Sequence, residues 1–480
     1  MKGEPGSTRL ELPKLTDGGT MTGIGAKQGA ALTLERLQAA VAEDAAVRFV
    51  ARLQPVGGLG DKVFPPTYTG GQYALESRVD EHGVVKEVVL LDSVQSQANR
   101  MEQALLAAHR DGRIALPMIS VSFSKVEELK ELGEITVLDA PHRLADAILR
   151  DSMLNGTLFP ATTEGQVLRR ATAKNATELF KLCPTALLFG IWESTGAAGG
   201  LGVKFQRAIV SEIIGVGAVV GRKTASRIDP LQVGRVPIYE ARERADGGIP
   251  WTADESKALA DGTNPDGTPR YKRFKVSSRA KGVPSEVNHG NVTPDTARHR
   301  GEMLRLGRDL AGEQRVIRDR DELPGGVTLE YAKHTAVLSL AALRRLHFPI
   351  DGGADASPVA RLVLAALGLF ALIELRRNDY DLRSRCALVL EGAPAMEIVK
   401  RDGVTEPVSL DGRSVKALLD EARQHAEAKK LIWRKQPLEL TPSTALRDLI
   451  VQSRRIGIVE TDGEEDAEAE PTGEDAPAED

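Results

Sequence analysis

The 480-residue chain has few cysteines and no hydrophobic run long enough to span a bilayer. Its two cysteines, Cys183 and Cys386, provide neither a disulfide framework nor metal-ligand spacing. The first residues, MKGEPGSTRLELPKL, lack the apolar core of a signal peptide, so we expect a cytoplasmic protein in a reducing compartment. The longest apolar run, LVLAALGLFALI at 362–373, is too short to cross a membrane and predicts a buried core helix.

Common enzyme signatures are also absent. The glycine-rich segments GGLGDK (57–62) and GAAGGLGVK (196–204) do not have the G-x-x-x-x-G-K-[ST] order of a P-loop. GxSxG, HExxH and CxxC do not occur, and the eight histidines are scattered. We therefore predict no catalytic residues, no metal ligands and no cofactor.

The net charge of −5 conceals an uneven distribution of charge. Residues 460–480 contain 11 acids and no base, so the rest of the chain has 63 basic and 57 acidic residues, a surplus of +6. This composition predicts a mildly basic body followed by a disordered acidic tail.

The order of the predicted elements indicates an α+β fold. It runs strand (48–54), helix (93–109), strand (116–123), strand (204–214), helix (359–377) and strand (382–390). This is the βαββαβ order of a ferredoxin-like or RRM-like domain with large insertions. We call this RRM-like domain the palm. Its first part, with a helical insertion, covers 31–240, and its second part covers 327–400, with a polar insertion (241–326) between them. A flexible N-terminus (1–30) precedes the palm, and a small C-terminal unit (401–459) and the acidic tail (460–480) follow it.

A polar cluster opens the predicted helix at 93–109. Its apolar residues, from Val94 to Ala108, recur at spacings of four and three, as on one helical face. Asp92 and Gln95 resemble a capping box, and a helix N-terminus attracts phosphates. The alternative is an ordinary capped surface helix.

Basic residues gather in three further places. RYKRFKVSSRAK (270–281) contains six bases and no acid, GRKTASRIDP (221–230) contains three bases, and bases also follow both glycine-rich segments. Such cations neutralise phosphates, and glycines let a backbone approach them closely. Solvated loops and plain turns are the alternatives. Because aromatic residues are only 4% of the chain, we favour a protein that holds the sugar-phosphate backbone and leaves base edges free.

Seven segments resemble one known family. They are RLQPVGGLGDKVFPPTY (52–68), YALE (73–76), VLLDSVQSQANRMEQALL (89–106), STGAAGGLGVKFQRAIVSEIIG (194–215), SRIDPL (226–231), VTLEYAKHTAVLSLAALRRL (327–346) and DLRSRCALVL (381–390). Together they are similar to the RAMP-superfamily backbone subunit of type I-G (formerly I-U) CRISPR Cascade surveillance complexes. The resemblance covers most of residues 45–395.

This resemblance implies a binding protein with an RRM-like palm and inserted finger and thumb elements. In such complexes several copies oligomerise along CRISPR RNA and present its spacer for pairing with target DNA in antiviral defence. The implied partners are CRISPR RNA, target DNA, further copies of the chain, other Cascade subunits and a recruited helicase-nuclease, with no membrane. The alternative is a CRISPR RNA-processing endoribonuclease of the same superfamily, for which Tyr331, Lys333 and His334 are the candidate residues.

From charge and position we select residues expected to bind RNA on or near the palm face. They are Lys62, Ser96, Asn99, Arg100, Lys204, Arg207, Arg222, Lys223, Arg227 and Arg385. Arg270, Lys272, Arg273 and Lys275 are candidates for nucleic-acid contact in the polar insertion.

Overall fold

The computed structural model describes most of the chain. The described residues are 29–68, 71–80, 82–193, 204–222, 238–245, 249–264, 267–274, 305–308, 314–317 and 324–460. Three of the candidate residues, Lys223, Arg227 and Lys275, lie outside this part of the chain, as do nearly all of the expected flexible N-terminus and acidic tail.

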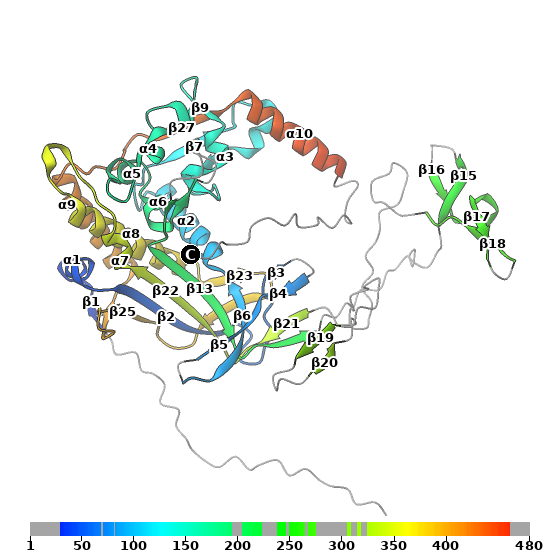
Figure 1. Cartoon of the computed structure of the whole chain (residues 1–480), viewed down its shortest axis with the longest axis horizontal. Coiled ribbons are helices and arrows are strands. Elements are labelled where there is room, and N and C mark those ends of the chain that lie inside the picture. Colours follow the sequence, from blue (N-terminus) through cyan, green and yellow to red (C-terminus); the bar gives the residue numbers. More distant parts are fainter. Residues whose placement is uncertain are drawn as a thin grey trace, which may run out of the picture.

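The fold is α+β and is built on one large mixed sheet (Figure 1). In sheet order its strands are β1 (Ala30–Ala31), β26 (Thr405–Ser409), β25 (Ala395–Val399), β2 (Ala46–Pro55), β22 (Tyr331–Ser339), β13 (Ile209–Val216), β6 (Val85–Asp92) and β5 (Leu75–Val79). The hairpin of β23 (Tyr380–Arg383) and β24 (Cys386–Leu390) joins through β24 to β2. All of these pairs are antiparallel except β1 with β26.

The two faces of this sheet differ because side chains alternate along each strand. In β22 the residues Ala332, His334, Ala336 and Leu338 are buried, whereas the residues between them are partly exposed. β2 has the same pattern, with Val47, Phe49, Ala51 and Leu53 buried. One face of the sheet therefore packs into the core, and we call the other the open face.

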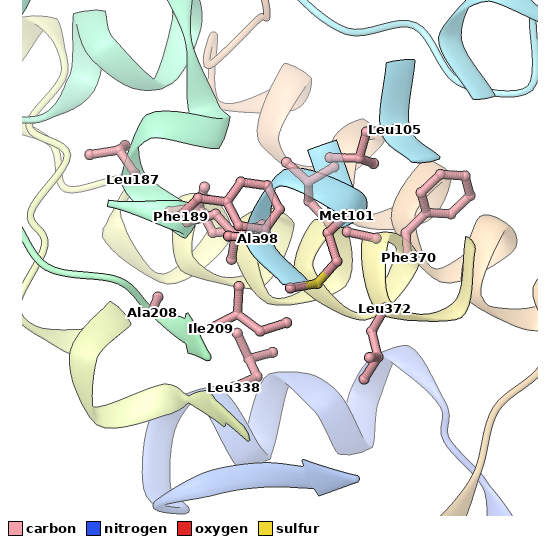
Figure 2. Packing of buried hydrophobic residues seen from close by; sticks show 14 of the residues in the cluster. Ala98, Met101, Leu105, Leu187, Phe189, Ala208, Ile209, Leu338, Phe370 and Leu372 are labelled. Carbon is pink, nitrogen blue, oxygen red and sulfur yellow. The ribbon is translucent and has the colours of Figure 1, made fainter. Parts of the chain in front are cut away.

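Helices cover the buried face. They are α1 (Leu34–Glu43), α2 (Val94–Arg110), α7 (Leu340–Arg344), α8 (Ser357–Arg377) and α9 (Gly412–Ala428). Figure 2 shows Ala98 and Met101 of α2 packed near Ile209 of β13 and Phe370 of α8. Helix α8 is long and apolar enough to cross a membrane by length and composition, but 83% of its most apolar window is buried inside the protein. The prediction of a core helix is confirmed.

A second, five-stranded sheet lies beside the first (Figure 1). Its strands are β10 (Thr157–Leu158), β9 (Ser152–Leu154), β27 (Leu438–Pro442), β7 (Ile119–Ser122) and β8 (Glu134–Thr136). The nearby helices are α3 (Ala147–Arg150), α4 (Gln166–Arg170), α5 (Thr177–Leu182), α6 (Pro184–Phe189) and α10 (Thr444–Glu460).

Six short strand pairs complete the described fold. They are β3 (Thr67–Tyr68) with β4 (Gln72–Tyr73), β11 (Ile191–Trp192) with β12 (Lys204–Phe205), β14 (Val219–Arg222) with β21 (Pro324–Thr328), β15 (Tyr239–Ala245) with β16 (Ile249–Thr252), β17 (Ala260–Thr263) with β18 (Pro269–Tyr271), and β19 (Arg305–Arg308) with β20 (Gln314–Ile317).

Two expectations about strands need correction. The segment 116–123 does contain a strand, β7, but β7 pairs with β27 and β8 in the second sheet instead of joining the large one. Its partner β27 lies more than 300 residues further along the chain, a pairing that local periodicity cannot reveal. The segment 382–390 is broken by Arg385, whose φ of 61° turns the chain between β23 and β24.

Candidate nucleic-acid interface

The polar cluster at the start of α2 is organised by Asp92, the last residue of β6. Its fully buried carboxylate accepts hydrogen bonds from Ser96 Oγ at 2.7 Å, Gln97 Nε2 at 2.5 Å and Arg100 Nε at 2.9 Å. The N-cap is Ser93, whose side chain accepts from the Ser96 amide, so the predicted capping box of Asp92 and Gln95 is wrong. Asp92 holds side chains in place and does not cap the backbone.

The same cluster borders a hollow of about 330 Å³ between α2 and the end of α8. Its lining residues are Ser96, Gln97, Asn99, Arg100, Gln103, His334, Leu375, Arg376, Asn378, Asp379, Tyr380, Asp381 and Leu382. Three candidate residues, Ser96, Asn99 and Arg100, thus share one site. They lie on the helical side of the large sheet, whereas we expected them on the palm face. Arg100 also donates to the Leu382 carbonyl at 2.5 Å, so its guanidinium is already engaged.

A buried chain of hydrogen bonds leads from this helix to His334. Ser211 Oγ donates to Gln97 Oε1 at 2.8 Å and lies 2.7 Å from His334 Nε2, while His334 Nδ1 is 3.0 Å from the Tyr380 hydroxyl. Burial, together with the nearby Arg376, lowers the pKa of His334 to about 3, so the imidazole is neutral near pH 7. The hydrogen bonds fix its orientation within the core.

The three residues proposed for an endoribonuclease do not share a site. His334 is fully buried on the helical side, whereas Tyr331 and Lys333, at alternate positions of β22, line a hollow on the open face. A general acid and base must both reach the same scissile bond. This geometry does not favour an endoribonuclease that uses Tyr331, Lys333 and His334 together.

Lys62 and Arg385 are linked by the first glycine-rich segment, and the backbone of Arg222 pairs with Pro324, beside the Gly325 that Lys62 contacts. Gly58 and Gly60, with φ of 95° and 87°, turn the glycine-rich segment so that Val63 bridges Val327 through hydrogen bonds of 2.8 and 2.9 Å. The next residue, Phe64, donates its amide to the Arg385 carbonyl at 2.9 Å. The first glycine-rich segment is therefore tied directly to the turn that carries Arg385.

The cations of this group have few anionic partners. Lys62 Nζ is 3.4 Å from the Gly325 carbonyl, and it lies so close to Gly221 that a Cβ there would be 2.5 Å away. The guanidinium carbon of Arg385 stands 3.8 Å above the Phe64 ring. Neither side chain forms an ion pair within the described part of the chain. We call Lys62 and Arg385 the loop cluster.

Lys204 and Arg207 lie in or next to the β11–β12 pair, which carries the exposed Trp192. Lys204 lies opposite Trp192 in the β11–β12 pair, with Nζ 5.4 Å from the indole centroid. Arg207 is half-buried near the Arg143–Glu102 ion pair, and both burial and Arg143 lower its pKa. These two cations are separate from the loop cluster in the sequence and have different aromatic and charged neighbours.

The basic residues of the polar insertion are more fully paired than their number suggests. Lys272 Nζ lies 2.9 Å from a Glu240 carboxylate oxygen, and Arg270 Nε donates to the Asp261 carbonyl at 2.7 Å. Arg273 stacks over the Tyr239 ring, 5.0 Å from its centroid. Of the three described candidates in this insertion, only Arg273 has an aromatic ring as its principal neighbour.

The residues expected to bind RNA did not include the cations of the open face, of which Lys333 was named only for the endoribonuclease alternative. Arg48, Arg52 and Lys333 lie on adjacent strands, with Arg52 directly opposite Lys333 and its guanidinium 3.9 Å above the Tyr331 ring. Arg48 pairs with Glu397 and Arg52 with Glu391, while Lys333 forms no ion pair among the residues described. Period-two alternation in RFVARLQ and YAKHTAVLS is the signal that places such residues on one face.

The geometry thus separates two kinds of cation. Arg100, Arg270 and Lys272 each have an acidic partner, whereas Lys62, Lys204 and Arg385 have none among the residues described. The second kind retains its charge for a ligand such as phosphate. Among the described residues, no three His, Cys, Asp or Glu side chains gather as a metal site would require.

One comparison with known proteins found a family to which part of the chain is similar. The family model described as CRISPR-associated protein GSU0053 matches residues 47–220, from β2 to β14, a stretch that contains Lys62, the Asp92 cluster and Lys204. No curated protein matches the chain. Over residues 47–220 the chain is similar to this family of CRISPR-associated (Cas) proteins, and the similarity supports a CRISPR-associated role.

Proposed function

We propose that this protein is the non-catalytic backbone subunit of a type I-G CRISPR Cascade complex of the RAMP superfamily. In this role several copies bind along CRISPR RNA and hold its spacer ready to pair with target DNA. Other Cascade subunits and a recruited helicase-nuclease are the further partners, and the setting is the cytoplasm.

The observation that carries the proposal is the order of strands and helices around the central sheet. Along the chain the order is β2, α2, β13, β22, α8, β25, and in the sheet it is β25-β2-β22-β13 with antiparallel neighbours. This order supports a ferredoxin-like, RRM-like palm, to which β5 and β6 are added beside β13. The long segments before β13 and before β22 are then the insertions in which fingers and a thumb would lie.

The distribution of charge supports a grip on the RNA backbone. Lys62, Lys204 and Arg385 present charge without an acidic partner in the described residues, and cations of this kind bind phosphates irrespective of sequence. The open face has Arg52 and Lys333 but only one aromatic residue, Tyr331, in its central strands. Such a surface suits a protein that leaves the guide bases free to pair.

The loop cluster provides the test. Lys62→Gln and Arg385→Gly each remove one cation, and the glycine suits the φ of 61° at position 385, so the fold is retained. Each variant should bind single-stranded RNA more weakly, and its plot of log K against log salt should be shallower by about 0.7, the value for one phosphate contact. Fluorescence anisotropy with a labelled spacer RNA measures both quantities.

Lys416→Gln is the matched control, because it removes one lysine charge on α9 whose ammonium pairs with Asp420. It should leave affinity and salt slope unchanged. The proposal would be contradicted by a strong preference for one RNA over scrambled RNA at equal salt. Specific cuts in repeat RNA incubated with the protein alone would instead favour the endoribonuclease.

A further inference from the structure

The β11–β12 pair displays a large aromatic ring to solvent. Trp192 is 62% exposed, although its neighbour Ile191 and the facing Phe205 are only 5% and 6% exposed. The pair therefore inserts one side into the core and projects the other. Leaving an indole in water forfeits the hydrophobic stabilisation that burial would give, and its faces stay accessible to a ligand.

Hydrogen bonds and a close contact hold the turn beneath Trp192. Arg143 donates to the Gly190 carbonyl at 3.2 Å, and it also makes two hydrogen bonds of 2.6 and 2.8 Å to the buried Glu102 carboxylate. Gly190 has a φ of 80°, and a Cβ at this position would lie 3.0 Å from Arg207. The turn preceding Trp192 and the residue Arg207 are thus fixed against one another.

This support contains more positive than negative charge. Among the described residues Glu102 is the acid that faces Arg143 and Arg207, and the Nε of Arg207 is buried with no hydrogen-bond partner among them. The other nearby acid, Glu193, is buried and lies 3.8 Å from Arg169. Lys204 adds an ammonium beside the indole itself. An aromatic ring flanked by uncompensated cations is suited to a base attached to a phosphate.

We propose that Trp192 is a stacking platform for one base of single-stranded RNA, and that Lys204 and Arg207 hold the adjoining phosphate. The inference rests on the proposed function and adds a base contact to a surface otherwise described by phosphate contacts. Stacking is tolerant of sequence because every base has a π-face. An anionic polymer fits the charge of the site better than an apolar protein surface does.

Trp192→Ala and Trp192→Phe test the platform in the full-length protein. The alanine variant should bind a spacer-length RNA about 10-fold more weakly, in the range for loss of one stacked base, and the phenylalanine variant should retain most of the affinity. Trp251→Phe, on the separate strand β16, is the control and should bind like the wild type. Because Trp192 is solvent-exposed, thermal unfolding of its two variants should be nearly the same as that of the wild type.

Tryptophan fluorescence gives a second measurement. The chain has three tryptophans, of which Trp433 is buried, and saturating RNA should quench emission in wild type and Trp251→Phe but not in Trp192→Phe. Equal RNA affinity of wild type and Trp192→Ala would overturn the platform while leaving the proposed function intact. Loss of self-association with unchanged RNA affinity would show a protein contact instead, and failure of the wild type to bind RNA would overturn both proposals.

Discussion

At the level of single residues, the partners of a cation in the fold decide whether it is available to bind RNA. Arg100 and Lys62 are both cations in the sequence. Arg100 is engaged by Asp92 and a carbonyl, whereas the partner of Lys62 among the described residues is a backbone carbonyl. Charge clustering predicted both as RNA-binding residues, because sequence shows which side chains are charged and not which acids face them. Trp192 was missed for a related reason: one tryptophan in a row of apolar residues gives no signal of its exposure.

His334 provides a prediction about pH. Its folded-state pKa of about 3 lies below the usual 6.5, so between these values the unfolded chain binds a proton that the folded chain does not. The free energy of unfolding should therefore fall as the pH is lowered through this range, with His334 contributing a loss of about 2 kcal/mol between pH 7.5 and 5. Urea unfolding at a series of pH values measures this change in the free energy of unfolding.

The comparison of the wild type with His334→Gln isolates this residue. Glu102 acts in the opposite direction over the same range, because burial raises its pKa and its folded form gains protons first. Both proteins contain Glu102, so its effect cancels in the difference between their unfolding curves. A difference that did not change with pH would show that His334 is not held neutral in the folded protein.

At the level of elements, long periodic segments were predictable and chain reversals were not. The helices expected at 93–109 and 359–377 are present as α2 and α8, because their apolar spacing and length leave few alternatives. The strand expected at 382–390 is interrupted at Arg385, a residue that rarely takes positive φ and gives no turn signal. That unpredicted turn is what presents Arg385 beside the first glycine-rich segment.

The packing of α8 gives a second prediction. At Gly368 an added Cβ would lie 3.0 Å from Leu188 of α6 and 3.2 Å from Leu338 of β22, so the helix has little space there. Gly368→Leu should lower the free energy of unfolding by about 1–3 kcal/mol through overpacking. Gly412→Leu is the control, since nothing lies within 4 Å of a Cβ at the start of α9. Equal stability of the two variants in urea would show that the side chains around Gly368 rearrange at little cost in free energy.

For the protein as a whole, the sequence predicted the class of fold but misassigned one strand. Segment 116–123 lies in the second sheet, whereas residues 331–339, which were not predicted as a strand, form β22 between β2 and β13. The pairing of strands that are hundreds of residues apart depends on how the whole core packs. Local sequence patterns carry no information about that packing. The apolar face of β22 is clear in the sequence, whereas its neighbours are known only from the structure.

Assembly on RNA is the last prediction. Copies that stack head to tail use two different surfaces, so they form open arrays unless something caps them. Two copies on one RNA also meet at a high effective concentration, which makes a weak contact between them effective. Light scattering should therefore show particles whose mass rises in proportion to RNA length, and no ordered array without RNA. With Arg385→Gly, particles of the same mass should form only at a higher RNA concentration. Lys416→Gln should require the same RNA concentration as the wild type. A closed ring of fixed size without RNA would contradict this arrangement, because a ring has no free end at which RNA length can set the number of copies.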